Sequence, residues 1–309
     1  MRWLDELYVG LRPRRGVFED GWGDEAELTH GLDPGLREVA PPPVAIRWTR
    51  ARAHAHARLR EGELISPDRG LPAESRLARV LLVEPREGEA RGLVVALSSW
   101  GEEDFEGRRQ MLAAATRAGV AALILETPFY GARRRVGQDG PRLRYVSDFV
   151  TGGRATVLEA RALMGWARER YPRVGVTGYS MGAQVAAMSA VLVPWPVHVV
   201  IAACALSPAR VFFDGPLRAD VERAPLGPGG HARLRDAMES LSILDLPPPH
   251  DPSRARILGT RADAIVSPGD SGAIARHWGT SVRWLDDGHV SALLWRGHAI
   301  GQAVVDAFA

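Results

Sequence analysis

The stretch VTGYSMGAQ, residues 176–184, places one serine between two glycines at the end of an apolar run. A strand that turns sharply into a helix needs small residues two before and two after the turn residue, because larger side chains collide with the flanking backbone. Gly178 and Gly182 occupy those positions around Ser180. Serine is also a favoured helix cap, and composition alone gives ~0.2 chance matches to Gly-x-Ser-x-Gly. The five residues therefore leave both interpretations open.

The residues on either side of Ser180 favour a nucleophile. RVGVTG before it is typical of a buried strand, and MGAQVAAMSAVL after it has the spacing and small residues of a helix packed on a sheet. This strand, tight turn and helix are the context that the motif requires. A hydroxyl alone is a poor nucleophile at neutral pH, so a base and a group that orients the base are needed as well.

Two later segments supply candidates for these partners, in the order serine, acid, histidine. Asp263 follows the apolar run ARILGT, and His289 follows SVRWLDDG and opens the loop before the last helix. Asp263 as a turn cap and His289 as a structural histidine are the alternatives. Asp286 and Asp287 are rival acids, but they are too close in sequence to His289 to approach its far nitrogen easily.

Acyl-transfer chemistry also needs donors aimed at the developing oxyanion, and the loss of one typically costs about 3 kcal/mol of barrier. The backbone amide of Met181, at the start of the helix after Ser180, is one candidate. The second is expected in LSSWGEEDF, after the run GLVVA. We place it at the Trp100 amide, with Ser99 as the near alternative.

The stretch ETPFYGARRR leaves another expected strand at the same edge of the sheet. Tyr130, Arg133 and Arg134 are therefore possible substrate-binding residues, since a guanidinium engages two oxygens of a phosphate or carboxylate at once. Ser99 is a further possible substrate-binding residue. In the alternative, Tyr130 packs under the loop and the arginines pair with surface carboxylates. The sequence leaves both open.

These candidates all lie in a part of the chain where short aliphatic runs alternate with longer helical patterns, from about residue 90 onward. This alternation is typical of βαβ units and predicts a mainly parallel sheet with helices around it. The expected strands are 92–98, 119–126, 173–178, 197–206, 255–260 and 281–286, and the expected helices are 106–118, 155–170, 181–192, 271–278 and 292–308.

The domain organisation is expected to be simple. Residues 1–42 form an N-terminal extension with weak helical signals and a proline run, and 43–309 form one α/β domain that begins with antiparallel strands. Residues from about 207 to 251 interrupt the alternation with glycines, prolines and the amphipathic piece LRDAMESLSIL. We expect this segment to be a short cap over the carboxyl ends of the strands.

The composition argues against several classes of protein. The 309 residues are 46% hydrophobic, and the formal net charge is only +2 with basic residues spread along the chain, which argues against nucleic acid as a partner. The single cysteine, Cys204, lies in an apolar run and is expected to be buried. No window is long and apolar enough to span a membrane, and the first sixteen residues lack the features of a signal peptide, so a cytoplasmic location is expected.

Beyond the serine motif, the chain resembles the α/β-hydrolase superfamily, and within it the family of α/β-hydrolase domain-containing protein 18 and its bacterial relatives. The stretches that carry the resemblance are GW at 21–22, GEEDFEGRRQM, ETPFYGARRR, VSDFVTGG, GYSMG, DAIVSP and VRWLDDGHVSA. The resemblance implies the α/β-hydrolase fold, with Ser180 as nucleophile, Asp263 as acid and His289 as base. The chain departs from the family in its short cap, and Trp100 in the oxyanion loop bears on the size of the pocket.

The function expected from these residues is a serine hydrolase that cleaves a carboxylic ester or thioester through an acyl-enzyme intermediate. The expected substrate is a small-molecule acyl ester or lipid-like compound, and neither a cofactor nor a metal is expected. The alternative is a catalytically silent protein of this fold that binds a ligand or a protein partner. The sequence does not indicate the oligomeric state, nor does it choose between esterase, lipase and thioesterase.

Overall fold

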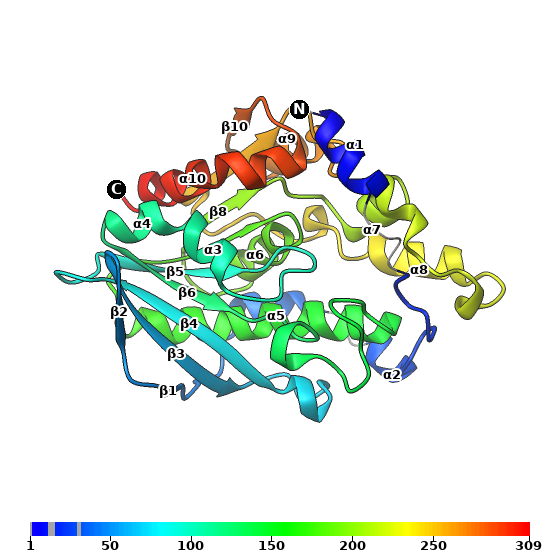
Figure 1. The fold of residues 1–309 in the computed structure, drawn as a ribbon, viewed down its shortest axis with the longest axis horizontal. Coiled ribbons are helices and arrows are strands. Elements are labelled where there is room, and N and C mark those ends of the chain that lie inside the picture. The colour runs from blue at the N-terminus through cyan, green and yellow to red at the C-terminus, as the bar shows by residue number, and fades with distance from the viewer. Residues whose placement is uncertain (1, 12–15, 30–31) are drawn as a thin grey trace.

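The computed structural model describes residues 2–11, 16–29 and 32–309, and one twisted sheet runs through the described chain (Figure 1). The strand order is β1-β3-β4-β6-β5-β7-β8-β9-β10, with β2 paired to β3 off this path. The strands are β1 (Arg47–Trp48), β2 (Arg52–His54), β3 (Ala57–Ile65), β4 (Leu77–Pro85), β5 (Gly92–Leu97), β6 (Val120–Leu125), β7 (Val174–Tyr179), β8 (His198–Ala202), β9 (Ala255–Thr260) and β10 (Val282–Leu285).

The sheet is parallel from β6 through β5 and β7 to β10, whereas β1 to β4 are antiparallel and β4 joins β6 antiparallel. Every residue of β5, β6 and β7 is buried, as expected for parallel strands covered on both faces. The predicted α/β architecture with a mainly parallel sheet is therefore confirmed. It brings the carboxyl ends of β7, β9 and β10 to one edge.

Helices cover both faces of the sheet (Figure 1). Side chains of β5 alternate between two cores: Leu93, Val95 and Leu97 pack with α5, α6 and α9, and Val94 and Ala96 pack with α3, α4 and α10. The helices are α1 (Arg2–Leu11), α2 (Glu25–Leu28), α3 (Glu106–Met111), α4 (Ala113–Arg117), α5 (Val146–Arg168), α6 (Met181–Val191), α7 (Pro208–Phe212), α8 (Gly230–Glu239), α9 (Pro268–Trp278) and α10 (His289–Ala307).

Several element boundaries differ from the sequence expectations. The helix expected over 106–118 is two short helices that meet at Leu112, and the strand expected over 197–206 ends at Ala202 because Ala203 has φ +49°. Helix α5 begins nine residues earlier than expected, at Val146. Two glycines, Gly152 and Gly153, weaken the helical signal there, but a Cβ at Gly152 would lie only 3.1 Å from the Phe129 ring, so packing selects glycine.

The segment 207–251 carries α7 and α8 and lies over the carboxyl edge of the sheet. Its apolar side chains share a core with Val17 and Phe18, and Val17 forms an isolated parallel bridge with Val221. The N-terminal segment is therefore tied directly to the segment expected as the cap. Among the described residues, no helix is both long and apolar enough to cross a bilayer.

Candidate active site

Ser180 is the single residue between β7 and α6, and its backbone has φ 56° and ψ −120°. A residue other than glycine in this region stores about 1–3 kcal/mol of strain and persists only when its surroundings hold it. The Ser180 amide donates to the Ala202 carbonyl at 3.0 Å, and the Ser180 carbonyl accepts from the amides of Ala183 and Gln184. The strand and the helix thus hold the strained turn from both sides.

The two glycines of the motif are required by close backbone packing. A Cβ at Gly178 would overlap the Gly182 carbonyl group, and a Cβ at Gly182 would lie 2.5 Å from the Leu97 carbonyl oxygen and 2.7 Å from that of Ser98. Atoms at such distances clash, so the first turn of α6 reaches β5 only because both side chains are absent.

Asp263 and His289 are hydrogen bonded, the imidazole Nδ1 donating to Oδ2 at 2.8 Å. Thr260 donates its hydroxyl to the same oxygen at 2.6 Å, and the amides of Ile265 and Val266 donate to Oδ1 at 2.8 and 2.7 Å. Burial acts to raise the pKa of the Asp263 carboxyl, but His289, Thr260 and the backbone amides outweigh it and hold that pKa below its usual value. The carboxylate is therefore kept charged against the imidazole.

His289 is the first residue of α10, not part of a loop before it. Its ring lies 5.1 Å from the ring of Tyr179, and the Tyr179 hydroxyl donates to the His289 carbonyl at 2.7 Å. Tyr179 is fully buried, and this burial raises the pKa of its hydroxyl, which stays a proton donor. The residue next to Ser180 thus anchors the backbone of His289, a contact that the sequence analysis missed although Tyr179 lies inside the motif.

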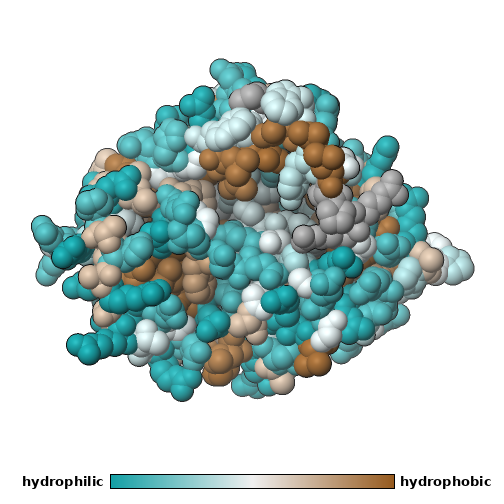
Figure 2. Space-filling model, viewed as in Figure 1, coloured by the Kyte–Doolittle hydropathy of each residue, from teal (hydrophilic) through white to brown (hydrophobic). Residues whose placement is uncertain are grey.

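Ser180 and His289 both line a cavity of about 310 Å³. The Ser180 hydroxyl makes no hydrogen bond to any other described residue. Apolar side chains of the 207–251 segment form one wall, and Tyr8 of α1 contributes to another. Figure 2 shows hydrophobic residues gathered where α1 meets α10. Leu293 and Leu294 of α10 line the cavity and are exposed, so its rim is apolar too.

The backbone amides of Met181 and Trp100, two residues that line this cavity, donate no hydrogen bond to another described residue. The Ser99 amide, the alternative to Trp100, donates to Glu102 Oε2 at 3.0 Å and is occupied. Arg108, which is almost fully buried, holds Glu102 in place through a 2.7 Å bond from Nε to Oε1. These contacts favour Trp100 over Ser99 as the second donor.

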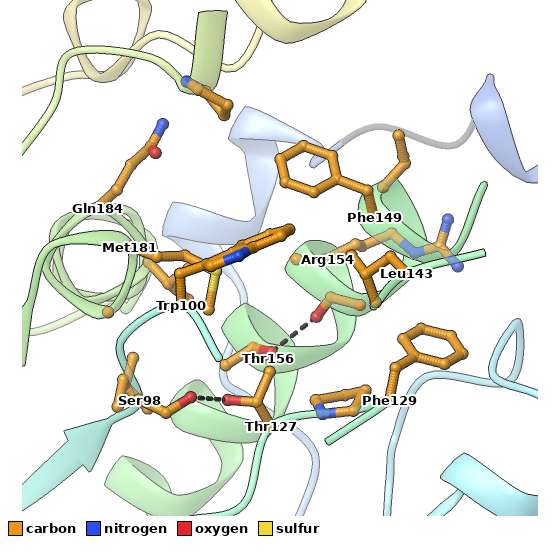
Figure 3. Close-up of a pocket in the computed structure, with 18 of the residues that line it drawn as sticks. Ser98, Trp100, Thr127, Phe129, Leu143, Phe149, Arg154, Thr156, Met181 and Gln184 are labelled. Carbon is orange, nitrogen blue, oxygen red and sulfur yellow. Dashed lines mark hydrogen bonds between the residues drawn. The ribbon is translucent and has the colours of Figure 1, made fainter. Parts of the chain in front are cut away.

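Trp100 also lines a second cavity of about 80 Å³, shown in Figure 3, so the two cavities are adjacent. The indole lies between Met181 and Phe149, and these residues line both cavities. Ring contacts at centroid distances of 5.2 to 6.3 Å join Trp100 to Phe212, Tyr130 and Phe149, the first two of them edge-on. The Trp100 ring is therefore firmly packed.

None of the three possible substrate-binding residues of ETPFYGARRR lines the cavity of Ser180, and Tyr130 lines the smaller cavity. Arg133 is fully buried and makes two bonds to Glu159, at 2.9 and 2.5 Å, besides bonds to two backbone carbonyls. Arg134 donates to the Gly131 carbonyl and pairs with Glu103 at 3.5 Å, and Tyr130 packs its buried ring beside Trp100. The charge of Arg133 is used within the fold, which argues against its binding an anionic substrate, whereas substrate binding by Arg134 and Tyr130 stays a prediction.

The two rival acids, Asp286 and Asp287, each pair with an arginine. Asp287 accepts from Arg296 Nε at 3.0 Å, and the exposed Asp286 pairs with Arg261 at 3.1 Å. The described residues contain no group of three or more histidine, cysteine, aspartate or glutamate side chains that could hold a metal ion. What the site offers is a strained serine, a charged Asp–His pair and unpartnered amides around one apolar cavity.

Comparison with known proteins adds a family and a fold. The family model described as alpha/beta hydrolase domain containing 18 matches residues 16–226 and 230–309. Acetyl xylan esterase 1 from Thermoanaerobacterium sp. JW/SL YS485 is 17% identical with a TM-score of 0.61, covering 96% of this chain and 97% of that one. Acetyl xylan esterase from Paenibacillus sp. R4 is 16% identical with a TM-score of 0.59, covering 87% and 90%.

A third similar structure is Est1E from Butyrivibrio proteoclasticus with bound ferulic acid, which is 15% identical with a TM-score of 0.53 and covers 75% of this chain and 95% of that one. At such identities these likenesses concern the fold alone. The family match is independent of them and spans nearly the whole chain.

Proposed function

The chain belongs to the alpha/beta hydrolase domain containing 18 family and has the α/β-hydrolase fold, and from this premise we propose that it is a serine hydrolase of carboxylic esters or thioesters. The observation that carries the proposal is the buried Asp263–His289 hydrogen bond at the wall of the cavity that Ser180 also lines. A catalytically silent binding protein has no physical need for this charged pair beside a strained serine.

In the proposed reaction, the Ser180 hydroxyl attacks the acyl carbon while His289 Nε2 takes its proton. The carbonyl oxygen becomes an oxyanion that accepts from the amides of Met181 and Trp100. The tetrahedral intermediate expels the alcohol or thiol, which receives the proton from His289 and leaves an acyl-Ser180 ester. Water, deprotonated by His289, then attacks the acyl carbon, and the second tetrahedral intermediate breaks its bond to Ser180 Oγ, which takes the proton back from His289 as the carboxylic acid leaves. Asp263 keeps Nδ1 protonated, so that Nε2 is free to act as the base.

The walls of the cavity support an uncharged substrate. Apart from Ser180, Ser99, Gln184 and His289, the cavity is lined mostly by apolar and aromatic side chains. The proteins titled acetyl xylan esterase share this fold and act, by their names, on acetyl groups. We therefore propose an ester with a small uncharged acyl group.

The domain division belongs to the same proposal. In it, residues 1–42 are an extension of the 43–309 hydrolase domain, and the segment from about 207 to 251 is the cap of the site. The contributions of Val211, Phe212 and Leu217 to the cavity and the Val17–Val221 bridge support this division.

The test is Ser180→Ala together with a fluorophosphonate probe. We expect the probe to label the native protein at Ser180 only, and the variant to lose at least about 10³-fold in kcat on p-nitrophenyl acetate. The fold should survive, since alanine fits the turn, and circular dichroism and the thermal midpoint check this. Native turnover by the folded variant would overturn the mechanism. A native protein that neither reacts with the probe nor hydrolyses esters would favour the binding-protein alternative.

A further inference from the structure

The N-terminal helix α1 buries one carboxylate against the backbone next to the proposed acid and base. Asp5 is the only residue of α1 that is fully buried, with an exposed fraction of 0%. Figure 1 shows α1 beside the start of α10, and the two helices pack together. A buried acid in an otherwise exposed helix requires partners that compensate for its lost hydration.

The partners of Asp5 are three backbone amides. Oδ2 accepts from the amide of Ala264 at 2.9 Å and from that of His289 at 2.7 Å, and Oδ1 accepts from the amide of Val290 at 2.7 Å. We call these three bonds the Asp5 clamp. No other described residue forms an ion pair with Asp5. Bonds from backbone amides to a carboxylate are about twice as strong as neutral ones, and the N-terminus of α10 favours a negative charge.

The clamp joins the two chain segments that carry the acid and the base. Ala264 directly follows Asp263, while His289 and Val290 begin α10, so one carboxylate ties the acid's loop to the base's helix. The Asp263–His289 bond spans those same two segments. Because α1 lies outside the residues matched by the family model, which begin at 16, the matched part of the chain does not supply this link.

We infer that Asp5 is a positioning residue: its carboxylate holds the loop of Asp263 and the start of α10 at the separation that the Asp263–His289 pair needs. This inference rests on the proposed function for its kinetic consequence. Asp5 does not line the cavity and takes no part in bond making. Misplacing a reactive group by about 1 Å costs on the order of 10²-fold in rate, so loss of the clamp lowers kcat more than it weakens substrate binding.

The experiment compares Asp5→Asn with Glu6→Gln. Asparagine keeps the size of the side chain, but its NH₂ group faces an amide N–H instead of accepting from it. Glu6 lies on the same helix, is exposed and, within the described part of the chain, pairs only with the exposed Arg2, so its variant is a matched control. For Asp5→Asn we expect kcat on p-nitrophenyl acetate, per site titrated with fluorophosphonate, to fall about 10- to 100-fold with KM changed less than twofold. Glu6→Gln should keep both within twofold.

A second measurement does not depend on turnover. Amide hydrogen exchange by NMR should become faster at Ala264, His289 and Val290 in Asp5→Asn, and stay at the native rate in Glu6→Gln. Unchanged exchange at these amides, or native kcat per titrated site in Asp5→Asn, would overturn the inference. If the native protein has no hydrolytic activity, the proposed function fails, while the exchange measurement still decides whether the clamp exists.

Discussion

At the scale of single residues, the site depends on charges and strain that are held by backbone groups. Ser180 keeps its strained conformation because three backbone hydrogen bonds fix it, and Asp263 keeps its charge because two amides and a hydroxyl solvate it. Both groups are thus organised before a substrate enters, which is the condition for electrostatic stabilisation at little reorganisation cost.

The first prediction concerns Asp263. Asp263→Asn preserves the shape of the side chain but can turn an NH₂ group toward Nδ1, which favours the wrong imidazole tautomer. We expect kcat on p-nitrophenyl acetate to fall about 10³- to 10⁴-fold with KM nearly unchanged. Asp287→Asn, which removes a carboxylate bound to Arg296, is the control and should stay within fivefold. A larger loss in Asp287→Asn than in Asp263→Asn would move the acid to position 287.

The same variant has a pH-dependent signature in stability. Since the Asp263 pKa is lower in the folded than in the unfolded chain, its charge stabilises the fold above the unfolded value, about 3.9, and this contribution is lost as the pH falls through the folded value. The difference in unfolding free energy between native protein and Asp263→Asn, measured with urea, should therefore shrink as the pH falls below about 4. A constant difference down to pH 2 would contradict the lowered pKa.

At the scale of elements, the site depends on how closely α6 approaches β5. Gly182 in the first turn of α6 faces the carbonyls of Leu97 and Ser98, which lead directly into the loop of Trp100. The distance between the two proposed oxyanion donors is therefore set by a helix-to-strand contact that only glycine permits.

The second prediction tests this contact. Gly182→Ala places a methyl group 2.5 Å from the Leu97 oxygen, so helix and strand must separate. We expect a loss of about 1–3 kcal/mol in the free energy of unfolding and a fall in kcat, measured by urea titration and ester turnover. Gly153→Ala in α5 is the control, because no atom lies within 4 Å of its Cβ and helix propensity favours alanine by about 0.5–1 kcal/mol. Equal stability of Gly182→Ala and the native protein would refute the argument.

At the scale of the whole molecule, the binding space is assembled from distant parts of the chain. Trp100 comes from the loop after β5, Phe149 from α5 and Phe212 from α7, and their rings contact one another. Figure 3 shows Trp100 and Phe149 at the smaller of the two cavities. Because Trp100, Phe149 and Met181 line both cavities, the two cavities are adjacent. We expect the Trp100 ring to limit the length of an acyl group that extends from Ser180 toward the smaller cavity.

The third prediction concerns the Trp100 ring between the two adjacent cavities. Trp100→Ala retains the backbone amide but opens the 310 Å³ cavity to the 80 Å³ cavity behind it. We expect the ratio of kcat/KM for p-nitrophenyl decanoate to that for the acetate to rise at least about tenfold, since each buried CH₂ contributes about 0.8 kcal/mol. Trp195→Ala, which removes an indole packed on Arg168 away from the site, should leave the ratio unchanged. An unchanged ratio in Trp100→Ala would show that the ring does not limit chain length.

Much of the architecture follows from local sequence signals. The parallel strands were predicted to within a few residues at most ends, because each is a short apolar run that only a doubly covered sheet buries. The glycine pattern around Ser180 likewise predicts the turn, since the clash that excludes larger side chains is between near neighbours in sequence. The same periodicity predicted that Asp263 and His289 follow the ends of two strands.

Other features were decided only by the tertiary structure. In the sequence, the residue type and position of Arg133 suit a substrate ligand. In the structure, its guanidinium pairs with Glu159, which lies 26 residues later on α5. Asp5 looks like one acid in a weak helix, yet it bonds an amide 284 residues later. The physical reason is the same in both cases: burial and pairing of a charge depend on which distant backbone and side-chain groups packing brings within 3 Å, and no local pattern encodes that.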